Sequence, residues 1–200
     1  MTNKIPPAVI MAAKKIKLLL LDVDGVLTDG KLYYGNSGEE LKAFDIQDGL
    51  GIKLLQKGGV QVGIITGRMS KLLQRRADEL GIDPLIQGRE DKLTALNEIL
   101  ETMQIDMSEI AFMGDDLPDL AVMRCTGLGI TPANGSSTNA KQADWQTASS
   151  GGQGAVREVA EMILDAQGKL QTILATINDQ TDATNLRIVG YRWRLLVNLG

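Results

Sequence analysis

The chain of 200 residues contains no histidine and only one cysteine, Cys125. Without histidine, acid–base chemistry has to use carboxylates, lysine, tyrosine or metal-bound water, and a zinc site is disfavoured. One cysteine cannot form an internal disulfide, which is typical of a reducing compartment. A cysteine phosphatase is excluded, because such enzymes carry an arginine six positions after the cysteine and this chain has Thr131 there.

The sequence also lacks long apolar runs and a strong excess of one charge. No run approaches the ~20 apolar residues that span a bilayer, and the net charge is −4. The glycine-rich motif of P-loop nucleotidases is absent as well. We expect a short surface helix over residues 8–15, after Pro6 and Pro7, and not a signal peptide. The prediction is a cytoplasmic protein that binds neither nucleic acid nor membranes.

The most informative stretch present is a run of four leucines at 18–21, followed by Asp22 and Asp24. Such a run predicts a strand buried on both faces of a parallel sheet. Ligands of these sheets bind beyond the carboxyl ends of the strands, and two acids placed there repel each other unless a cation or an acid–base reaction uses them. An EF-hand is excluded, because Val26 and Tyr33 stand where it needs oxygen ligands.

Strands and helices alternate along the rest of the chain. The expected further strands cover 60–65, 84–86, 110–113, 128–130 and a short piece at Trp145; the expected helices start near Asp48 and after Gly154 and cover 70–80, 91–103 and 117–124. A β-hairpin is expected over residues 31–44, with its turn at 35–38. The pattern predicts an α/β protein with a doubly wound, Rossmann-like parallel sheet and a β-hairpin insertion after the first strand.

We expect one domain over residues 1–177. The remaining residues, 178–200, are predicted to be a C-terminal tail that is either mobile or part of a subunit contact.

Polar side chains follow four of the strands: Asp22 and Asp24, Thr66, Lys92, and Asp115 with Asp116. Taken singly, Thr66 fits a helix cap, Lys92 a solvated helix residue and Asp115 an N-cap. Together at four strand ends, acids, a hydroxyl and a lysine favour phosphoryl transfer, because charge spreads over the phosphoryl oxygens in the transition state. Magnesium suits such a site, since it binds carboxylates and phosphate oxygens.

These groups resemble, in order, the four motifs of the haloacid dehalogenase superfamily of phosphatases. The motifs are Asp-Val-Asp-Gly at 22–25, Thr-Gly-Arg at 66–68, Lys92, and Gly-Asp-Asp-Leu-Pro-Asp at 114–119. More closely, residues 16–170 resemble the family that hydrolyses 3-deoxy-D-manno-octulosonate 8-phosphate in lipopolysaccharide synthesis. That likeness includes Asp-Gly at 48–49 and the glycine-led segment 151–159.

The resemblance implies a role for each motif residue. Asp22 would be the nucleophile that forms an aspartyl-phosphate, and Asp24 would protonate the leaving oxygen and then deprotonate the attacking water. Thr66 and Lys92 would hold phosphate oxygens, and Lys92 would also offset the charge of Asp22. Magnesium would be bound by Asp22, Asp115 and the backbone carbonyl of Asp24.

For two further acids of the last motif, the sequence allows more than one role. Asp116 and Asp119 fit either a water-mediated contact with the metal or a role in orienting Lys92. For Asp119, a position on the surface of a helix fits equally well.

The gaps between the motifs are short. Segment 29–66 has room for a hairpin and one helix. Segment 92–115 has room for one helix and one strand. Neither segment therefore contains a separate cap domain. The resemblance then implies a capless enzyme that forms a homotetramer, with hairpins packed around a central axis and neighbouring subunits closing each site. The hairpin from Lys31 to Phe44 is the first expected contact.

For the substrate, a phosphorylated sugar acid, Arg68 and Arg76 are the candidates to bind the carboxylate, because guanidinium pairs with carboxylate bidentately. The resemblance adds further substrate-binding positions: Asp24, Asp45, Ile46, Gln47, Asp48, Gly49, Lys53 and Lys92. Asp45 and Gln47 stand where the family often has asparagine and arginine, so a nine-carbon sugar acid is the nearest alternative substrate. Arg75 fits a solvated helix position.

Two other classes of protein fit the sequence less well. A signalling receiver domain also gathers acids, a hydroxyl and a lysine, but its lysine comes last, whereas Lys92 precedes Asp115 here. Asp24 would also work against a long-lived phosphoryl group. A catalytically silent subunit is disfavoured, because every catalytic group of the resembling family is present.

Overall fold

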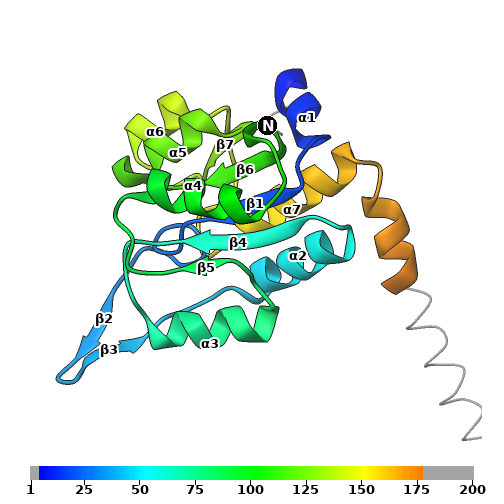
Figure 1. Ribbon diagram of the computed structural model, residues 1–200. Helices are drawn as coiled ribbons and strands as arrows, with labels where there is room; N and C mark the ends of the chain where they lie inside the picture. Colours follow the sequence, from blue (N-terminus) through cyan, green and yellow to red (C-terminus); the bar gives the residue numbers. More distant parts are fainter. Residues whose placement is uncertain (1–4, 178–200) are drawn as a thin grey trace, which may run out of the picture.

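The computed structural model describes residues 5–177, except for the side chains of 39–40. Six parallel strands form one sheet in the order β5-β4-β1-β6-β7-β8 (Figure 1). They are β1 (Leu18–Leu21), β4 (Gln61–Ile65), β5 (Leu85–Ile86), β6 (Ile110–Met113), β7 (Leu128–Thr131) and β8 (Trp145–Gln146). The predicted α/β class and parallel sheet are confirmed. The predicted tail over 178–200 lies outside the described residues.

The four leucines of β1 form the centre of the molecule. All four are completely buried, and successive side chains point to opposite faces of the sheet. Leu19 and Leu21 belong to the larger apolar cluster, and Leu18 and Leu20 belong to the smaller one on the other face. An uninterrupted apolar run is therefore what this strand requires.

Helices cover both faces of the sheet (Figure 1). The larger cluster joins the sheet to α1 (Pro7–Ala13), α2 (Ile46–Lys57), α3 (Lys71–Leu80) and α7 (Ala155–Ala166). The smaller cluster joins it to α4 (Lys92–Thr102) and α5 (Leu120–Cys125). Residues 170–177 are also helical.

Side-chain caps set the helix starts. Asp45 accepts a hydrogen bond from the Gln47 amide at 2.6 Å, so α2 begins at Ile46 and not at Asp48 as predicted. Asp91 caps α4 in the same way through the Thr94 amide, at 3.1 Å. A cap satisfies amides that the first helical turn leaves without a partner.

The predicted hairpin is present as a separate two-stranded antiparallel sheet that projects from the body (Figure 1). Its strands are β2 (Tyr33–Gly35) and β3 (Gly38–Leu41), so the turn is tighter than the predicted 35–38. Gly38 has a φ of +119°, which side chains rarely tolerate. This glycine allows the chain to reverse within two residues.

The sheet changes direction of winding between β1 and β6. From β1 the chain passes through α2 to β4, toward one edge of the sheet. From β6 it passes through α5 to β7, toward the other edge. The connections therefore diverge at the carboxyl ends of these neighbouring strands and leave a crevice there, which is where open α/β sheets bind ligands.

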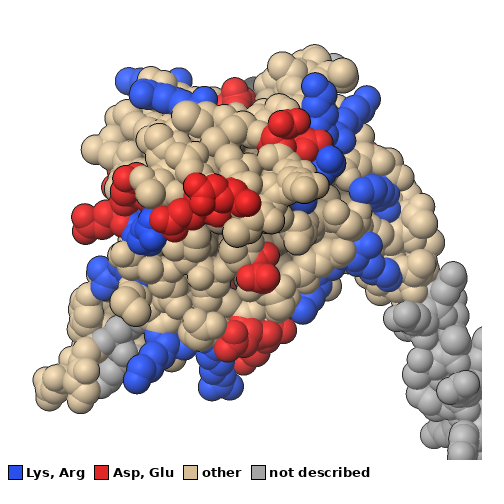
Figure 2. Space-filling model, viewed as in Figure 1, with Lys and Arg blue, Asp and Glu red and all other residues tan. Residues whose placement is uncertain are grey.

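Two short elements were not predicted: a turn of 3-10 helix before β6, η1 (Met107–Glu109), and α6 (Ser137–Gln142) after β7. The helix predicted over 117–124 begins as a turn of 3-10 helix, η2 (Leu117–Asp119), which precedes α5. Between residues 5 and 177, no helix combines the length and apolarity needed to cross a bilayer. On the face drawn in Figure 2, acidic and basic side chains are interspersed, without the continuous basic surface typical of nucleic-acid binding.

Candidate active site

Asp22 lies at the end of the central strand, in the crevice between the two diverging connections. Its amide donates to the carbonyl of Met113 at 3.0 Å and so extends the pairing of β1 with β6 by one residue. Its Oδ1 lies 2.9 Å from Nζ of Lys92, the first residue of α4. The side chain is thus buried and ion-paired at the edge of the sheet.

Asp119 organises the neighbouring loop. Its Oδ2 accepts from the amides of Asp115 at 3.0 Å and Asp116 at 3.2 Å, and its Oδ1 accepts from Lys92 Nζ at 2.6 Å. With 1% exposure, Asp119 is not a residue of the helix surface. Gly114 is required beside it, because a Cβ there would stand 2.4 Å from the Asp119 side chain.

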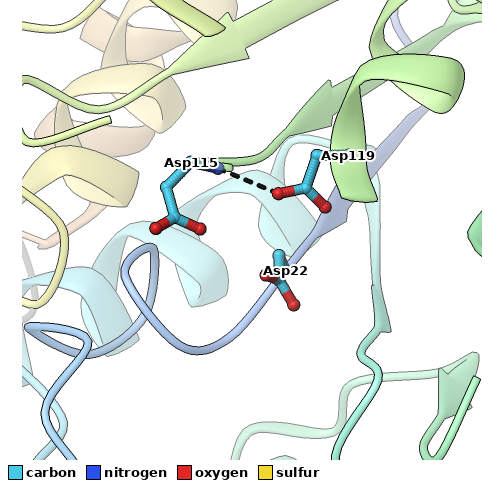
Figure 3. A group of neighbouring side chains, drawn as sticks. All are labelled: Asp22, Asp115 and Asp119. Atoms are coloured by element: carbon cyan, nitrogen blue, oxygen red, sulfur yellow. Dashed lines mark hydrogen bonds between the residues drawn. The ribbon is translucent and has the colours of Figure 1, made fainter. Parts of the chain in front are cut away.

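Three carboxylates converge at this point. One oxygen each of Asp22, Asp115 and Asp119 lies within 4.8 Å of the others (Figure 3). Burial, opposed in part by Lys92, raises the pKa of Asp22 to about 6, and burial with the charges of Asp22 and Asp119 raises that of Asp115 to about 7. Such crowding is unfavourable for three anions without a cation.

The donor set fits Mg²⁺, which prefers hard oxygen ligands. Both oxygens of Asp119 already accept hydrogen bonds from Lys92 and from two amides. This leaves Asp22 and Asp115, the two carboxylates predicted as ligands, as the ones best placed to bind the ion.

Lys92 is protonated in this environment. Burial alone would lower the pKa of its ammonium group, but the adjacent carboxylates of Asp22 and Asp119 outweigh that effect and raise it. A permanent positive charge therefore stands beside Asp22.

A cleft of about 370 Å³ opens in front of these groups. It is lined by Asp22, Asp24, Thr66, Gly67, Arg68, Glu90, Lys92 and Pro118. Thr66 follows β4 directly, and its amide and carbonyl bond to Ile86 and Arg89 across the sheet edge. The cleft thus contains the predicted Asp22, Asp24, Thr66, Arg68 and Lys92, together with Glu90 and Pro118, which were not predicted.

Asp24 is held by Arg68 and by Lys42, and the sequence did not single out Lys42. Its Oδ1 accepts from Nζ of Lys42 at 2.5 Å, and its Oδ2 lies 3.6 Å from Nε of Arg68. Arg68 also donates to the hydroxyl of Tyr34, at 2.5 Å. No motif or periodicity marks Lys42 or Tyr34, because their role arises only when the hairpin folds back onto the loop after β1.

The segment after β7 supports the acid-bearing loops. Asn134 donates to the carbonyl of Gly25 at 3.1 Å and accepts from the amide of Gly151 at 2.6 Å. Ser136 donates its amide to the carbonyl of Asp115 at 2.7 Å. Only the small, polar composition of 132–142 signalled a loop here, and nothing in it indicated these partners.

The other predicted substrate-binding residues lie outside the cleft. Arg76 lines a separate groove of about 260 Å³ with Lys42 and Phe44, and it donates to the carbonyl of Asp45 at 3.4 Å. Gly49 is in close contact with Arg76.

Four more of them occupy α2. Ile46 is 83% exposed, and Gln47 follows it in the first turn. Asp48 is buried and accepts from the amides of Gly154 and Arg157, so its carboxylate caps α7. Lys53 donates to the last carbonyl of α3, Leu80, at 2.6 Å. Lys42 lines that groove with Ile46 and Arg76 and contacts Asp24 of the cleft.

Known proteins resemble the chain over most of its length. Residues 85–159 match the family model of haloacid dehalogenase-like hydrolases. The 3-deoxy-D-manno-octulosonate 8-phosphate phosphatase of Yersinia pestis is 49% identical over 163 residues, which is 82% of this chain and 87% of that protein. The same phosphatase of Escherichia coli K12 is 48% identical over 162 residues, 81% of this chain and 86% of that protein.

Solved structures resemble it equally. The Moraxella catarrhalis 3-deoxy-D-manno-octulosonate 8-phosphate phosphatase, in complex with magnesium, phosphate and the sugar acid, superimposes with a TM-score of 0.82 at 47% identity, covering 84% of this chain and 97% of that one. The Yersinia pestis structure gives a TM-score of 0.81 at 48% identity, over 82% of this chain and 89% of that one.

Proposed function

The chain belongs to the haloacid dehalogenase-like hydrolases and, within them, to the 3-deoxy-D-manno-octulosonate 8-phosphate phosphatases, and from this membership we propose how its residues carry out the reaction. It is a magnesium-dependent phosphatase that hydrolyses this phosphoric monoester to the free sugar acid and phosphate. We place the reaction in the synthesis of lipopolysaccharide precursors in the cytoplasm.

One observation carries the proposal. Asp22, at the end of the central strand, lies 2.9 Å from a protonated lysine and within 4.8 Å of two further carboxylates, at the base of an open cleft. This arrangement is suited to an anionic nucleophile that must meet an anionic phosphate. Bound Mg²⁺, held by Asp22 and Asp115, would supply the neutralising charge that lets the two approach.

In the first step, a carboxylate oxygen of Asp22 attacks phosphorus and the ester P–O bond breaks. Asp24 gives its proton to the departing sugar oxygen, and such proton transfer is typically worth ~10²–10⁴-fold in rate. Lys92 and the Thr66 hydroxyl hold phosphoryl oxygens, whose charge is largest in the transition state.

In the second step, the aspartyl-phosphate is hydrolysed. Asp24, now a carboxylate, takes a proton from water as the water oxygen attacks phosphorus, and the bond between phosphorus and Asp22 breaks. Phosphate leaves, and both acids return to their starting states.

The substrate-binding assignments remain proposals. Arg68 lines the cleft and is suited to the sugar carboxylate. Arg76 on α3 and the segment Asp45–Gly49 at the start of α2 lie outside it, so they would reach a sugar acid only where that region faces a cleft. Asp45 and Gln47 differ from the residues that the family often has at these positions. A nine-carbon sugar acid is therefore the second candidate substrate.

We further propose that the enzyme is capless and assembles as a homotetramer. Within residues 5–177, the hairpin is the only insertion between β1 and α2, and it exposes the apolar side chains of Leu32, Tyr33, Tyr34 and Leu41. Exposed apolar groups gathered on one projecting element favour a protein contact. A neighbouring subunit placed there would restrict access to an otherwise open cleft.

The test is phosphate release from a panel of phosphorylated sugar acids, with magnesium and with a chelator. We expect a preference for the eight-carbon acid and loss of turnover with the chelator. Asp24→Asn should be inactive or should stop at the phosphoenzyme, and Asp83→Asn, in a surface loop, serves as the control. Equal rates on unrelated sugar phosphates would contradict the substrate, and turnover without metal would contradict the mechanism.

A further inference from the structure

Lys42 is a buried lysine at the base of the hairpin, next to β3. Its side chain is 4% exposed, whereas its neighbour Leu41 is 54% exposed. Lysine is almost never fully buried without an anionic partner. Here the partner is Asp24, the proton-transfer residue, whose Oδ1 lies 2.5 Å from Nζ.

The hairpin also contacts Asp24 by a second path. Oδ2 of Asp24 lies 3.6 Å from Nε of Arg68, and Arg68 donates to the Tyr34 hydroxyl on β2 at 2.5 Å. Each hairpin strand therefore contributes to one side of this carboxylate: Lys42 directly and Tyr34 through Arg68. Two cations on the two oxygens restrict the rotation of the carboxyl group.

The place of Lys42 distinguishes it from Lys92. Lys92 lines the cleft, beside Asp22, where phosphate would bind. Lys42 is not among the residues that line this cleft; it lines the adjacent groove with Phe44 and Arg76 and contacts Asp24 from there. A side chain in that position is suited to fix Asp24 and not to hold phosphate.

We propose that Lys42 is a positioning residue for proton transfer by Asp24, so that the hairpin is part of the catalytic apparatus. This inference rests on the proposed function. It concerns the proton that the leaving sugar oxygen requires and not the attack of Asp22 on phosphorus.

Lys42 keeps its own proton in both steps. When Asp24 carries a proton, Lys42 donates a hydrogen bond to Oδ1 and leaves the proton on Oδ2, which passes to the leaving oxygen as the ester bond breaks. When Asp24 is a carboxylate, Lys42 remains its ion-pair partner while Oδ2 accepts a proton from the attacking water.

The test compares two leaving groups in single-turnover measurements with magnesium. The sugar-acid phosphate has an alkoxide leaving group, which needs a proton to depart. The second substrate is p-nitrophenyl phosphate, whose leaving group, p-nitrophenolate, departs without a proton. For Lys42→Met, phosphoenzyme formation should slow by about 10²-fold with the sugar-acid phosphate and by less than about threefold with p-nitrophenyl phosphate. With the aryl substrate in excess, a separate multiple-turnover measurement should then show a burst of p-nitrophenolate, because the second step still needs Asp24.

Lys31→Met is the matched control, because Lys31 lies at the same hairpin, is largely exposed and pairs only with Asp29 in the described structure. Its rates should equal those of the wild type. Should Lys42→Met fail to fold in thermal unfolding, Lys42→Gln is measured in the same way with the same expectation.

Three outcomes would overturn the inference: an equal loss with both substrates, an unchanged rate with the sugar-acid phosphate, or a change in KM alone. Failure of the proposed substrate is seen separately, as absence of turnover of the sugar-acid phosphate by the wild type. The comparison then uses another alkyl phosphate that the wild type hydrolyses.

Discussion

Two lysines with buried side chains form ion pairs with the acids of the site. Lys92 contacts Asp22 and Asp119, and Lys42 contacts Asp24. Because a buried charge without a partner is strongly unfavourable, each lysine and its acids are fixed relative to each other. The proposed nucleophile, Asp22, and the proposed proton-transfer residue, Asp24, thus have separate cationic partners, although one residue separates them in the sequence.

The raised pKa values of Asp22 and Asp115 predict how pH and magnesium affect stability. Both carboxyls bind protons in the metal-free folded protein at pH values where the unfolded chain has released them. Their contribution to stability is therefore largest at low pH and is lost as pH rises through about 6 and 7. Magnesium replaces these protons, so it should stabilise the protein more at pH 8 than at pH 5.5, by roughly 1–3 kcal/mol.

Thermal unfolding at the two pH values, with magnesium and with a chelator, measures this difference. Asp115→Asn should remove most of the pH dependence of the magnesium effect, while Asp144→Asn, which lies at the far end of β7, should keep it. Stronger stabilisation by magnesium at pH 5.5 than at pH 8 would show that these acids do not bind the metal.

At the scale of elements, the segment after β7 acts as a brace for the loop after β1. Asn134 joins the carbonyl of Gly25 to the amide of Gly151, and Gly25 follows Asp24 directly. Close packing adds to this, since a Cβ on Gly151 would stand only 1.8 Å from the Gly25 carbonyl oxygen. The loop with both proposed catalytic acids is therefore positioned by residues more than 100 positions away.

Asn134→Ala should lower both stability and kcat. Two partly buried hydrogen bonds are lost, which costs about 1–2 kcal/mol of unfolding free energy, and the freed loop should reduce kcat about tenfold through Asp24. Denaturant unfolding and steady-state kinetics measure the two effects. Gln146→Ala is the control, because Gln146 bonds to Pro132 and Ala133 of the same loop without touching Gly25; a similar loss of kcat in this variant would contradict the brace.

At the scale of the whole molecule, we assign different roles to the sheet, the cleft and the hairpin. The sheet holds Asp22 and Asp115 at adjacent strand ends, and the cleft in front of them is open to solvent. The hairpin projects from the body (Figure 1). It carries exposed apolar side chains. A second copy of the chain that covers these side chains would explain why they are apolar.

The double variant Tyr33→Ser/Leu41→Ser should therefore dissociate the assembly. Sedimentation of the wild type should give four times the chain mass of 21.6 kDa, and the variant should sediment as a smaller species. Met11→Ser is the control, because Met11 is an exposed apolar residue on α1. A wild type that sediments as a single chain would refute the tetramer.

The sequence by itself determined the sheet and the position of the acids. The apolar run Leu18–Leu21 predicted a strand buried on both faces, and the strand is buried in this way. Each acid motif follows its strand directly in the chain. Both depend on local order along the chain, which a sequence displays. Helix starts were shifted where a cap such as Asp45 was not recognised.

Apart from the pairing of Lys92 with Asp22, only the tertiary structure decided the partners of those acids. Lys42, Asn134 and Tyr34 carry no motif, and they reach the acid loops across many intervening residues. Asp119 fitted a helix surface equally well until Lys92 and two amides were found on its carboxylate. Hydrogen bonds and ion pairs of this kind depend on distances in the folded chain, and a sequence pattern contains no such distances.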